Sequence, residues 1–252
     1  KGRMQASFLA WRDGDAYQLA LAADLEAASL KRLQMFVLRA KVKLATLSDS
    51  HVLLGIAGPQ AAEALADAAL PCPAAPLTTA SSGSVKVIRL EASRYIVSIP
   101  QEGVAALWQK VTLKARPAGL PVWRWLDVQA GFPLVTAATK EEFVPQMADF
   151  EKLGGISFHK GCYPGQEIVA RTQYLGKVKR HLYRVTSDQA LVAGTDLHSP
   201  DNPDQACGKI VSGAPSPAGG FEALAVVQSN FAGNLHLGTR EGPKIEAVAV
   251  NP

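Results

Sequence analysis

The side chain with the most distinctive chemistry in this sequence is the thiol of Cys162, which stands in the short run HKGCYPG at residues 159–165. Glycines before and after the cysteine permit backbone conformations closed to other residues, and Pro164 removes an amide donor. Such a run can hold a thiol at the surface, where Lys160 and His159 would favour the nucleophilic thiolate. The pattern indicates a reactive cysteine.

Two other interpretations of this run stay open. Free cysteine is among the most buried residue types, so Cys162 would equally fill a small apolar hole in a tight turn. His159 and Cys162 also have the spacing of half a metal site, although zinc usually takes four ligands. Gln166 and Glu167 then begin a short helical or extended segment, and Glu167 can pair with a nearby cation such as Arg171.

The composition is that of a globular protein of one or two domains. The chain has 252 residues, of which 48% are hydrophobic and 19% charged, with a net charge of +4. That charge is compatible with an anionic ligand but requires none. Three cysteines without a C-x-x-C pair argue against a disulfide framework and favour a reducing, cytoplasmic location. No apolar run predicts a membrane span. The sequence begins at Lys1, close to a strand-like run, so we expect the native N-terminus to precede it.

Residue patterns up to position 113 predict two related α+β halves. A hairpin is expected at 6–23, because its Asp13-Gly14 dipeptide tolerates the positive φ of a tight turn. A helix capped by Asp24 follows, with apolar residues at helical spacing as far as Val37. Further strands are predicted at 41–48, 51–58, 85–90 and 94–99, helices at 58–70 and 102–113, and a proline-containing loop at 70–84.

From about Gly176 the pattern changes to short strand-like runs separated by Gly, Pro, Asn and Asp, which is typical of a small barrel or sandwich. We therefore expect an α+β domain at 1–175 and an all-β domain at 176–252. Neither G-x-G-x-x-G nor a Walker loop is present. The predicted strands of the second domain are 177–185, 208–213, 221–227, 234–238 and 244–250.

The octapeptide KGCYPGQE at 160–167 resembles the signature of the YgfZ family of folate-binding proteins, which are relatives of the glycine-cleavage T-protein. The similarity extends over AGFPLV at 130–135 and continuously over 143–180. Upstream, residues 1–4, 36–44 and 52–65 also follow the family pattern, so the resemblance covers most of residues 1–180.

This resemblance implies a folate-binding α+β region like that of the T-protein, built from two related halves and followed by a small antiparallel β-barrel. It implies tetrahydrofolate or a derivative as cofactor, and a role in assembling or repairing iron–sulfur proteins and, through them, in tRNA thiomodification. Cys162 is the residue on which activity would depend, with Lys160 beside it. The matching companions in the signature loop are Gly161, Tyr163, Gly165, Gln166 and Glu167.

The resemblance also suggests which residues contact folate. Relatives often have a glutamate where this chain has Gln129, and Asp127 is the carboxylate that can pair with the pterin in its place. The expected cofactor-binding residues are Trp125, Asp127, Gln129, Phe132 and Arg171, with Trp123, Arg39 and Lys177 as further candidates for stacking or for binding the anionic tail. The ordinary alternatives are a place in the core for each aromatic ring and a solvated surface for each charge.

A second function, folate-dependent aminomethyl or one-carbon transfer, is the alternative implied by the T-protein relationship. T-proteins have an Asp-Asp pair where this chain has Gln5-Ala6, and a neutral amide cannot act as a general base, so glycine cleavage is not expected. A third function, direct tRNA binding, would use the basic run at 177–184. We favour the first function, and expect folate and iron–sulfur client proteins as partners, a monomer, no resident metal, no membrane contact and no direct tRNA binding.

Overall fold

The computed structural model describes residues 2–91, 93–174 and 178–250. The chain divides into two compact units: residues 32–119 form one, and residues 1–31 together with 120–252 form the other. The predicted α+β fold with a C-terminal β-barrel is confirmed. The predicted domain boundary between 175 and 176 lies outside the described residues and stays a prediction.

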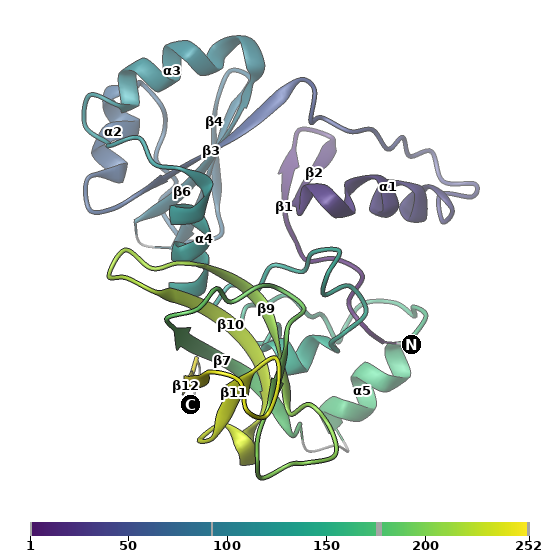
Figure 1. Ribbon diagram of the computed structural model, residues 1–252. Coiled ribbons are helices and arrows are strands. Elements are labelled where there is room, and N and C mark those ends of the chain that lie inside the picture. Colours follow the sequence, from purple (N-terminus) through teal and green to yellow (C-terminus); the bar gives the residue numbers. More distant parts are fainter. Residues whose placement is uncertain (1, 92, 175–177, 251–252) are drawn as a thin grey trace. The chain divides into compact units, whose positions relative to one another are not determined.

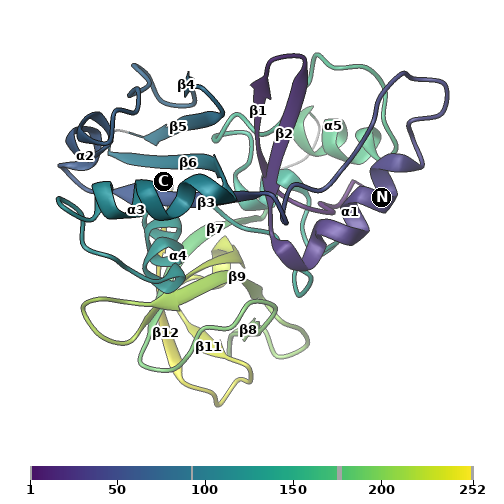
Figure 2. The same ribbon diagram turned by 90° about the horizontal axis from the view of Figure 1, so that it is seen from above.

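The unit at 32–119 is a four-stranded antiparallel sheet with two helices. Its strands are arranged in the order β3-β6-β5-β4, as Figure 2 shows. The elements are β3 (His51–Ala57), α2 (Ala61–Asp67), β4 (Thr79–Ser82), β5 (Val85–Glu91), β6 (Arg94–Pro100), η2 (Gln101–Gly103) and α3 (Val104–Val111). Val87 and Val97 of the sheet are fully buried in one cluster with Leu65 of α2 and Leu107 of α3. Burying such side chains stabilises the unit by about 1.5–3 kcal/mol each.

The barrel occupies the end of the chain (Figure 1). Its six strands close in the order β10-β7-β12-β11-β8-β9, and every neighbouring pair is antiparallel. The elements are β7 (Arg180–Ser187), β8 (Asp196–His198), β9 (Gly208–Pro215), β10 (Phe221–Gln228), η4 (Ser229–Phe231), β11 (Leu235–Leu237) and β12 (Lys244–Ala249). Alternate residues point inward, so Leu197, Leu235 and Ile245 are buried together inside the barrel.

The remaining elements lie outside the barrel, and several of them contribute to a second core. They are β1 (Phe8–Asp13), β2 (Ala16–Leu21), η1 (Ala23–Leu25), α1 (Glu26–Gln34), α4 (Leu120–Gln129), η3 (Pro145–Ala148) and α5 (Gln166–Tyr174). Buried Met4 and Val128 contribute to one cluster with Leu182, Leu224 and Val226 of the barrel strands. Helix α4 therefore lies on the barrel, in contact with β9 and β10.

Several predicted elements are confirmed, and four details were wrong. Strands β1 and β2 form the predicted hairpin, with φ of +61° at Gly14 in its turn. Residues 41–48 form no strand, because they are almost all exposed and no neighbouring strand pairs with them. Asp24 lies inside η1 and accepts a hydrogen bond from Ala137 N at 2.9 Å instead of capping the helix. Two short strands were not predicted: β4, which lies inside the predicted loop, and β8. With only four and three residues, they are too short to show a clear alternation of apolar and polar residues.

No helix among the described residues is both long and apolar enough to cross a membrane.

Candidate functional site

The signature loop leads into α5 and leaves Cys162 exposed. The interpretation that this cysteine fills an apolar hole is therefore wrong. Gly165, at the end of the loop, has φ of +93°, a conformation that favours glycine. Among the described residues, no three His, Cys, Asp or Glu side chains are grouped so as to hold a metal ion, so His159 and Cys162 have no such set around them.

The turn that precedes α5 is fixed by Gln166. Its side-chain Oε1 accepts a hydrogen bond from Tyr163 N at 3.1 Å, while its own backbone N donates to Tyr163 O at 3.2 Å. These two bonds close the Tyr163–Gln166 turn that precedes α5, with Pro164 and the positive-φ Gly165 at its two central positions, as in a type II turn. The loop therefore ends at a defined point, at Gly165, and α5 begins four residues after Cys162.

A buried glutamine connects α5 to η3. Gln146 is fully buried, and its Nε2 donates to the backbone oxygen of Val169 in α5 at 2.8 Å. Its Oε1 is buried and has no hydrogen-bond partner in the described residues. An unsatisfied buried acceptor lowers the free energy of unfolding by about 1–3 kcal/mol, so the Gln146 amide has a cost in stability as well as a bond to α5. Gln146 thus holds the helix that follows the signature loop.

The cations predicted around Cys162 are exposed. The Nζ atom of Lys160 lies 4.1 Å from the centroid of the Tyr163 ring, so this charge is positioned by a cation–π contact on the residue next to the thiol. His159 is exposed, and so is Arg171 in the last turn of α5. Glu167 forms no ion pair with them in the part of the chain that the structure describes, so that predicted pairing is wrong.

The predicted pterin-binding residues of α4 form a network with the barrel. Trp125 Nε1 donates to Glu222 Oε1 at 2.9 Å, and Gln129 Nε2 donates to Glu222 Oε2 at 2.5 Å. Arg184 of β7 donates to the Gln129 Oε1 at 3.0 Å, and Ser216 donates to Glu222 at 2.7 Å. Both ends of the Gln129 amide are therefore bonded to protein groups.

Glu222 is the centre of this network. Burial would raise its pKa, but hydrogen bonds from Trp125, Ser216 and Gln129, with the charge of Arg184, outweigh burial and lower the pKa from its usual value. Glu222 is consequently ionised at neutral pH and accepts bonds through both oxygens. Sequence reasoning missed it because its partners in α4 are almost a hundred residues away; the available signal was one carboxylate in the otherwise apolar strand FEALAVV.

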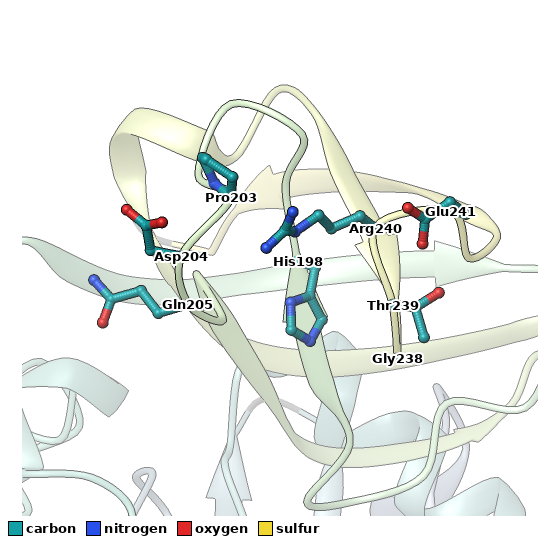
Figure 3. Close-up of a pocket in the computed structure, with 8 residues that line it drawn as sticks. All are labelled: His198, Pro203, Asp204, Gln205, Gly238, Thr239, Arg240 and Glu241. Carbon is teal, nitrogen blue, oxygen red and sulfur yellow. The ribbon is translucent and has the colours of Figure 1, made fainter.

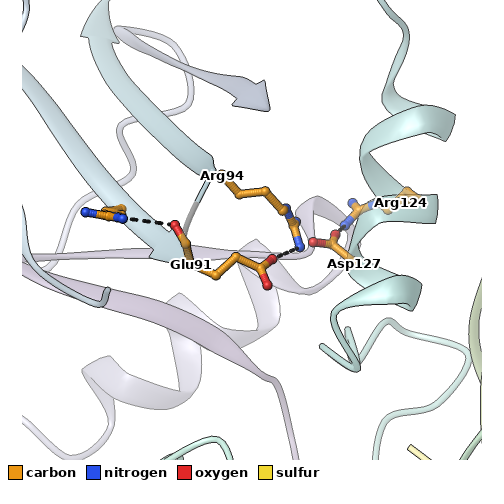
Figure 4. Close-up of polar contacts among 5 residues, drawn as sticks. Glu91, Arg94, Arg124 and Asp127 are labelled. Carbon is orange, nitrogen blue, oxygen red and sulfur yellow. Dashed lines mark hydrogen bonds and ion pairs between the residues drawn. The ribbon is translucent and has the colours of Figure 1, made fainter. Parts of the chain in front are cut away.

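Asp127 is another residue of α4 that was predicted to bind the pterin, and it is 7% exposed. Arg124, one turn earlier, lies 3.7 Å away from its carboxylate (Figure 4). The backbone oxygen of Asp127 accepts a hydrogen bond from Phe132 N at 2.9 Å, and this bond fixes the turn that follows α4. In the other unit, Arg94 Nη1 forms an ion pair with Glu91 Oε1 at 2.9 Å, and Figure 4 also draws these two residues. The oxygens of a buried carboxylate can accept hydrogen bonds from N–H donors of a ligand.

Gln5, where T-proteins have an aspartate, donates from Nε2 to Glu141 Oε1 at 2.5 Å. Glu141 has φ of +64°, and its backbone N donates to Met4 O at 2.8 Å. The sequence gives no indication of this pair, because the two residues are 136 positions apart. A carboxylate therefore lies beside the neutral amide after all.

The other predicted residues are spread over several elements. Trp123, Trp125 and Phe132 are partly buried, and Arg39 is exposed. Of the basic run at 177–184, Lys177 lies outside the described residues, and Arg184 is directed to Gln129. The cofactor-binding roles predicted for these side chains stay predictions.

Comparison with solved structures defines the class of fold. The chain superimposes on the glycine cleavage system aminomethyltransferase T from Bartonella henselae with a TM-score of 0.74 and 19% identity, covering 100% of this chain and 72% of that one. At this identity the likeness shows the fold alone: the protein has the T-protein fold with its C-terminal barrel.

Comparison with curated sequences narrows this class. Proteins named "tRNA-modifying protein YgfZ" from Shigella sonnei and Escherichia coli are 34% identical to the chain over 201 residues, and the one from Yersinia pseudotuberculosis is 35% identical. The match covers 78% of this chain and 61% of each relative, so the chain spans less than two thirds of their length. No family model matches the chain. The chain is a YgfZ homologue, and the resemblance carried by the signature loop is confirmed.

Proposed function

We propose that the protein binds tetrahydrofolate or a derivative and supports the assembly or repair of iron–sulfur proteins, and through them tRNA modification, with Cys162 as its reactive group. The observation that carries the proposal is the exposed thiol held in the hydrogen-bonded loop before α5. Its homologues are named for tRNA modification, which agrees with the last part of the proposal. We also expect the protein to act in the cytoplasm as a monomer.

The described residues fit a folate in part. Asp127 offers a buried carboxylate for pterin N–H groups, and Lys160 and Arg171 are exposed cations suited to an anionic glutamate tail. Gln129 would keep its bonds to Glu222 and Arg184, so its task is to hold α4 in place. When bound, tetrahydrofolate would supply a carrier for one-carbon units. The chain would supply the Asp127 carboxylate as a hydrogen-bond acceptor, the cations Lys160 and Arg171, and the Cys162 thiol.

The test is genetic complementation combined with folate binding. In a strain lacking the gene, Cys162→Ala in the full-length protein should fail to restore tRNA thiomodification, measured by mass spectrometry of tRNA nucleosides. Cys72→Ala is the matched control, because Cys72 is also an exposed thiol but lies in the other unit. Tetrahydrofolate should bind the purified wild type by calorimetry. Full restoration by Cys162→Ala would remove the thiol from the mechanism, and absence of binding would remove folate.

One observation favours a second candidate, folate-dependent aminomethyl transfer. The Glu141 carboxylate lies against the Gln5 amide, so this chain offers an acid–base group beside the position of the T-protein carboxylates. Methylene transfer from an aminomethyl donor to tetrahydrofolate should then be measurable with the full-length protein. Glu141→Gln should reduce that rate at least about a hundredfold, as loss of a general base does. No transfer with folate bound would exclude this candidate.

A further inference from the structure

A cavity of about 290 Å³ lies at one end of the barrel, formed by residues that have no part in the function proposed above. Its walls are the loop after β8 and the turn between β11 and β12. The volume is at the lower end of the range of about 300–1,000 Å³ that is usual for small-molecule sites. The lining residues are His198, Pro203, Asp204, Gln205, Gly238, Thr239, Arg240 and Glu241.

The walls are held by backbone and buried side-chain bonds. In the β8 loop, Cys207 N donates to Leu197 O at 2.8 Å, and Asp201 N donates to the buried Ser199 hydroxyl at 3.2 Å. In the opposite turn, Gly238 N donates to Asp196 O at 2.9 Å, with φ of +74° at this glycine. The cavity is therefore formed before any ligand arrives, which lowers the entropic cost of binding.

Four of the polar side chains that line the cavity have no internal partner in the described part of the chain. Within the described residues, neither hydrogen bond nor ion pair is made by the side chains of His198, Asp204, Thr239 or Arg240. Figure 3 shows the Arg240 side chain reaching over the His198 ring, with Asp204 and Gln205 on one wall and Thr239 and Glu241 on the other. Donors and acceptors thus surround one space and remain available for a ligand.

The arrangement of charge restricts the ligand. The Arg240 guanidinium and the Thr239 hydroxyl can bind the oxygens of a phosphate, which guanidinium groups recognise by paired hydrogen bonds. Asp204 and Glu241 would repel a bare anion, so the ligand must also carry N–H donors. The Asp204 carboxylate and the Gln205 amide oxygen are acceptors for such donors. A ligand with a phosphate and an N–H-donating ring could bind Arg240 and Thr239 through the phosphate, and Asp204 and Gln205 through the ring.

We propose that this cavity binds a nucleoside monophosphate, with the phosphate at Arg240 and Thr239 and the hydrogen-bonding edge of the base at Asp204 and Gln205. The His198 ring lies between these two ends and offers a flat surface to the ligand. The site shares no residue with the signature loop or α4, so it does not depend on the folate proposal.

The probe is guanosine monophosphate, whose base has two N–H donors on one edge, added to the full 252-residue chain and followed by calorimetry and by amide NMR. It should shift the amide signals of the lining residues. Guanosine, ribose phosphate and inorganic phosphate, which each lack one part of the ligand, should bind at least about tenfold more weakly, because each loses one charged or bidentate contact. Equal binding of inorganic phosphate would overturn the proposal.

Two variants test the two walls separately. Arg240→Gln should weaken guanosine monophosphate and ribose phosphate alike by at least about tenfold. Asp204→Asn should weaken guanosine monophosphate but not ribose phosphate. Arg116→Gln, an exposed arginine in the other unit, is the control and should change neither. Unchanged binding in Arg240→Gln, or displacement of the nucleotide by tetrahydrofolate from the same amides, would disprove this site while leaving the Cys162 test unaffected.

Discussion

The loop that carries Cys162 and the junction between α4 and the barrel belong to the same compact unit, but they are built in opposite ways. At the junction, Trp125, Gln129 and Glu222 bond to one another, and the adjoining core is buried. In the loop, the thiol and its cations are exposed, and the described contacts include the two hydrogen bonds of the Tyr163–Gln166 turn, one cation–π pair and one edge-on ring contact. The comparison suggests that the junction provides stability and the loop provides accessible chemistry, so mutations in the two regions should have separable effects.

The largest effect on stability is expected in the core that the barrel strands share with α4. Leu224 is fully buried, so Leu224→Ala should lower the free energy of unfolding by about 2–5 kcal/mol. Urea denaturation followed by tryptophan fluorescence measures this. Cys162→Ala should change it by less than about 0.5 kcal/mol, because the side chain is exposed. If the two variants lost similar amounts of unfolding free energy, the view that the junction provides stability and the loop does not would be contradicted.

The next effect concerns the carboxylate of the junction. Glu222→Ala leaves the donors of Trp125, Gln129 and Ser216 without their acceptor and should cost about 1–3 kcal/mol. Because the pKa of Glu222 is lowered in the folded chain, its contribution is present at neutral pH and is lost as the pH falls from 4.5 through the folded value. The stability difference between wild type and Glu222→Gln should shrink over that interval. A difference independent of pH would contradict the assigned ionisation.

Gln129→Glu tests whether the amide is needed at the junction. The new carboxylate would face Glu222 in place of a donor, and repulsion between like charges should cost about 1–2 kcal/mol at neutral pH, offset in part by Arg184. Acidification should restore part of that loss, because protonation of one carboxyl removes the repulsion. Gln109→Glu, on an exposed face of α3, is the matched control and should be neutral. Gain of folate binding by Gln129→Glu would show that this position also contacts the pterin.

The smallest effect is expected in the loop. Gln166→Ala removes the acceptor for Tyr163 N and should cost about 0.5–1 kcal/mol, mostly by loosening of the Tyr163–Gln166 turn before α5. Hydrogen exchange should show faster exchange of the Tyr163 amide, with barrel amides unchanged. If amides across the barrel also exchanged faster in this variant, the loop and the junction would be coupled, and mutations in the two regions would not have separable effects.

The sequence predicted the elements that carry a repeating pattern. Five of the six barrel strands and the hairpin at Gly14 follow from alternation and turn residues, and the signature run at 160–167 indicated the family. Contacts that join distant segments were not accessible in the same way. Glu222 with Gln129, and Glu141 with Gln5, are pairs whose members look like ordinary surface residues until the fold brings them together.

Closure of the barrel has a further consequence for handling this protein. Each barrel strand is paired on both sides, so the barrel leaves no strand edge for another chain to extend. The hairpin of β1 and β2 is, within the described residues, a sheet of two strands only, and the side chains of Phe8, Tyr17 and Leu19 on it are exposed. Open strand edges are therefore found in this hairpin and at β3 and β4 of the four-stranded sheet, and a lysine placed on the outer edge of the hairpin should reduce self-association of the 252-residue chain there while the barrel stays unchanged.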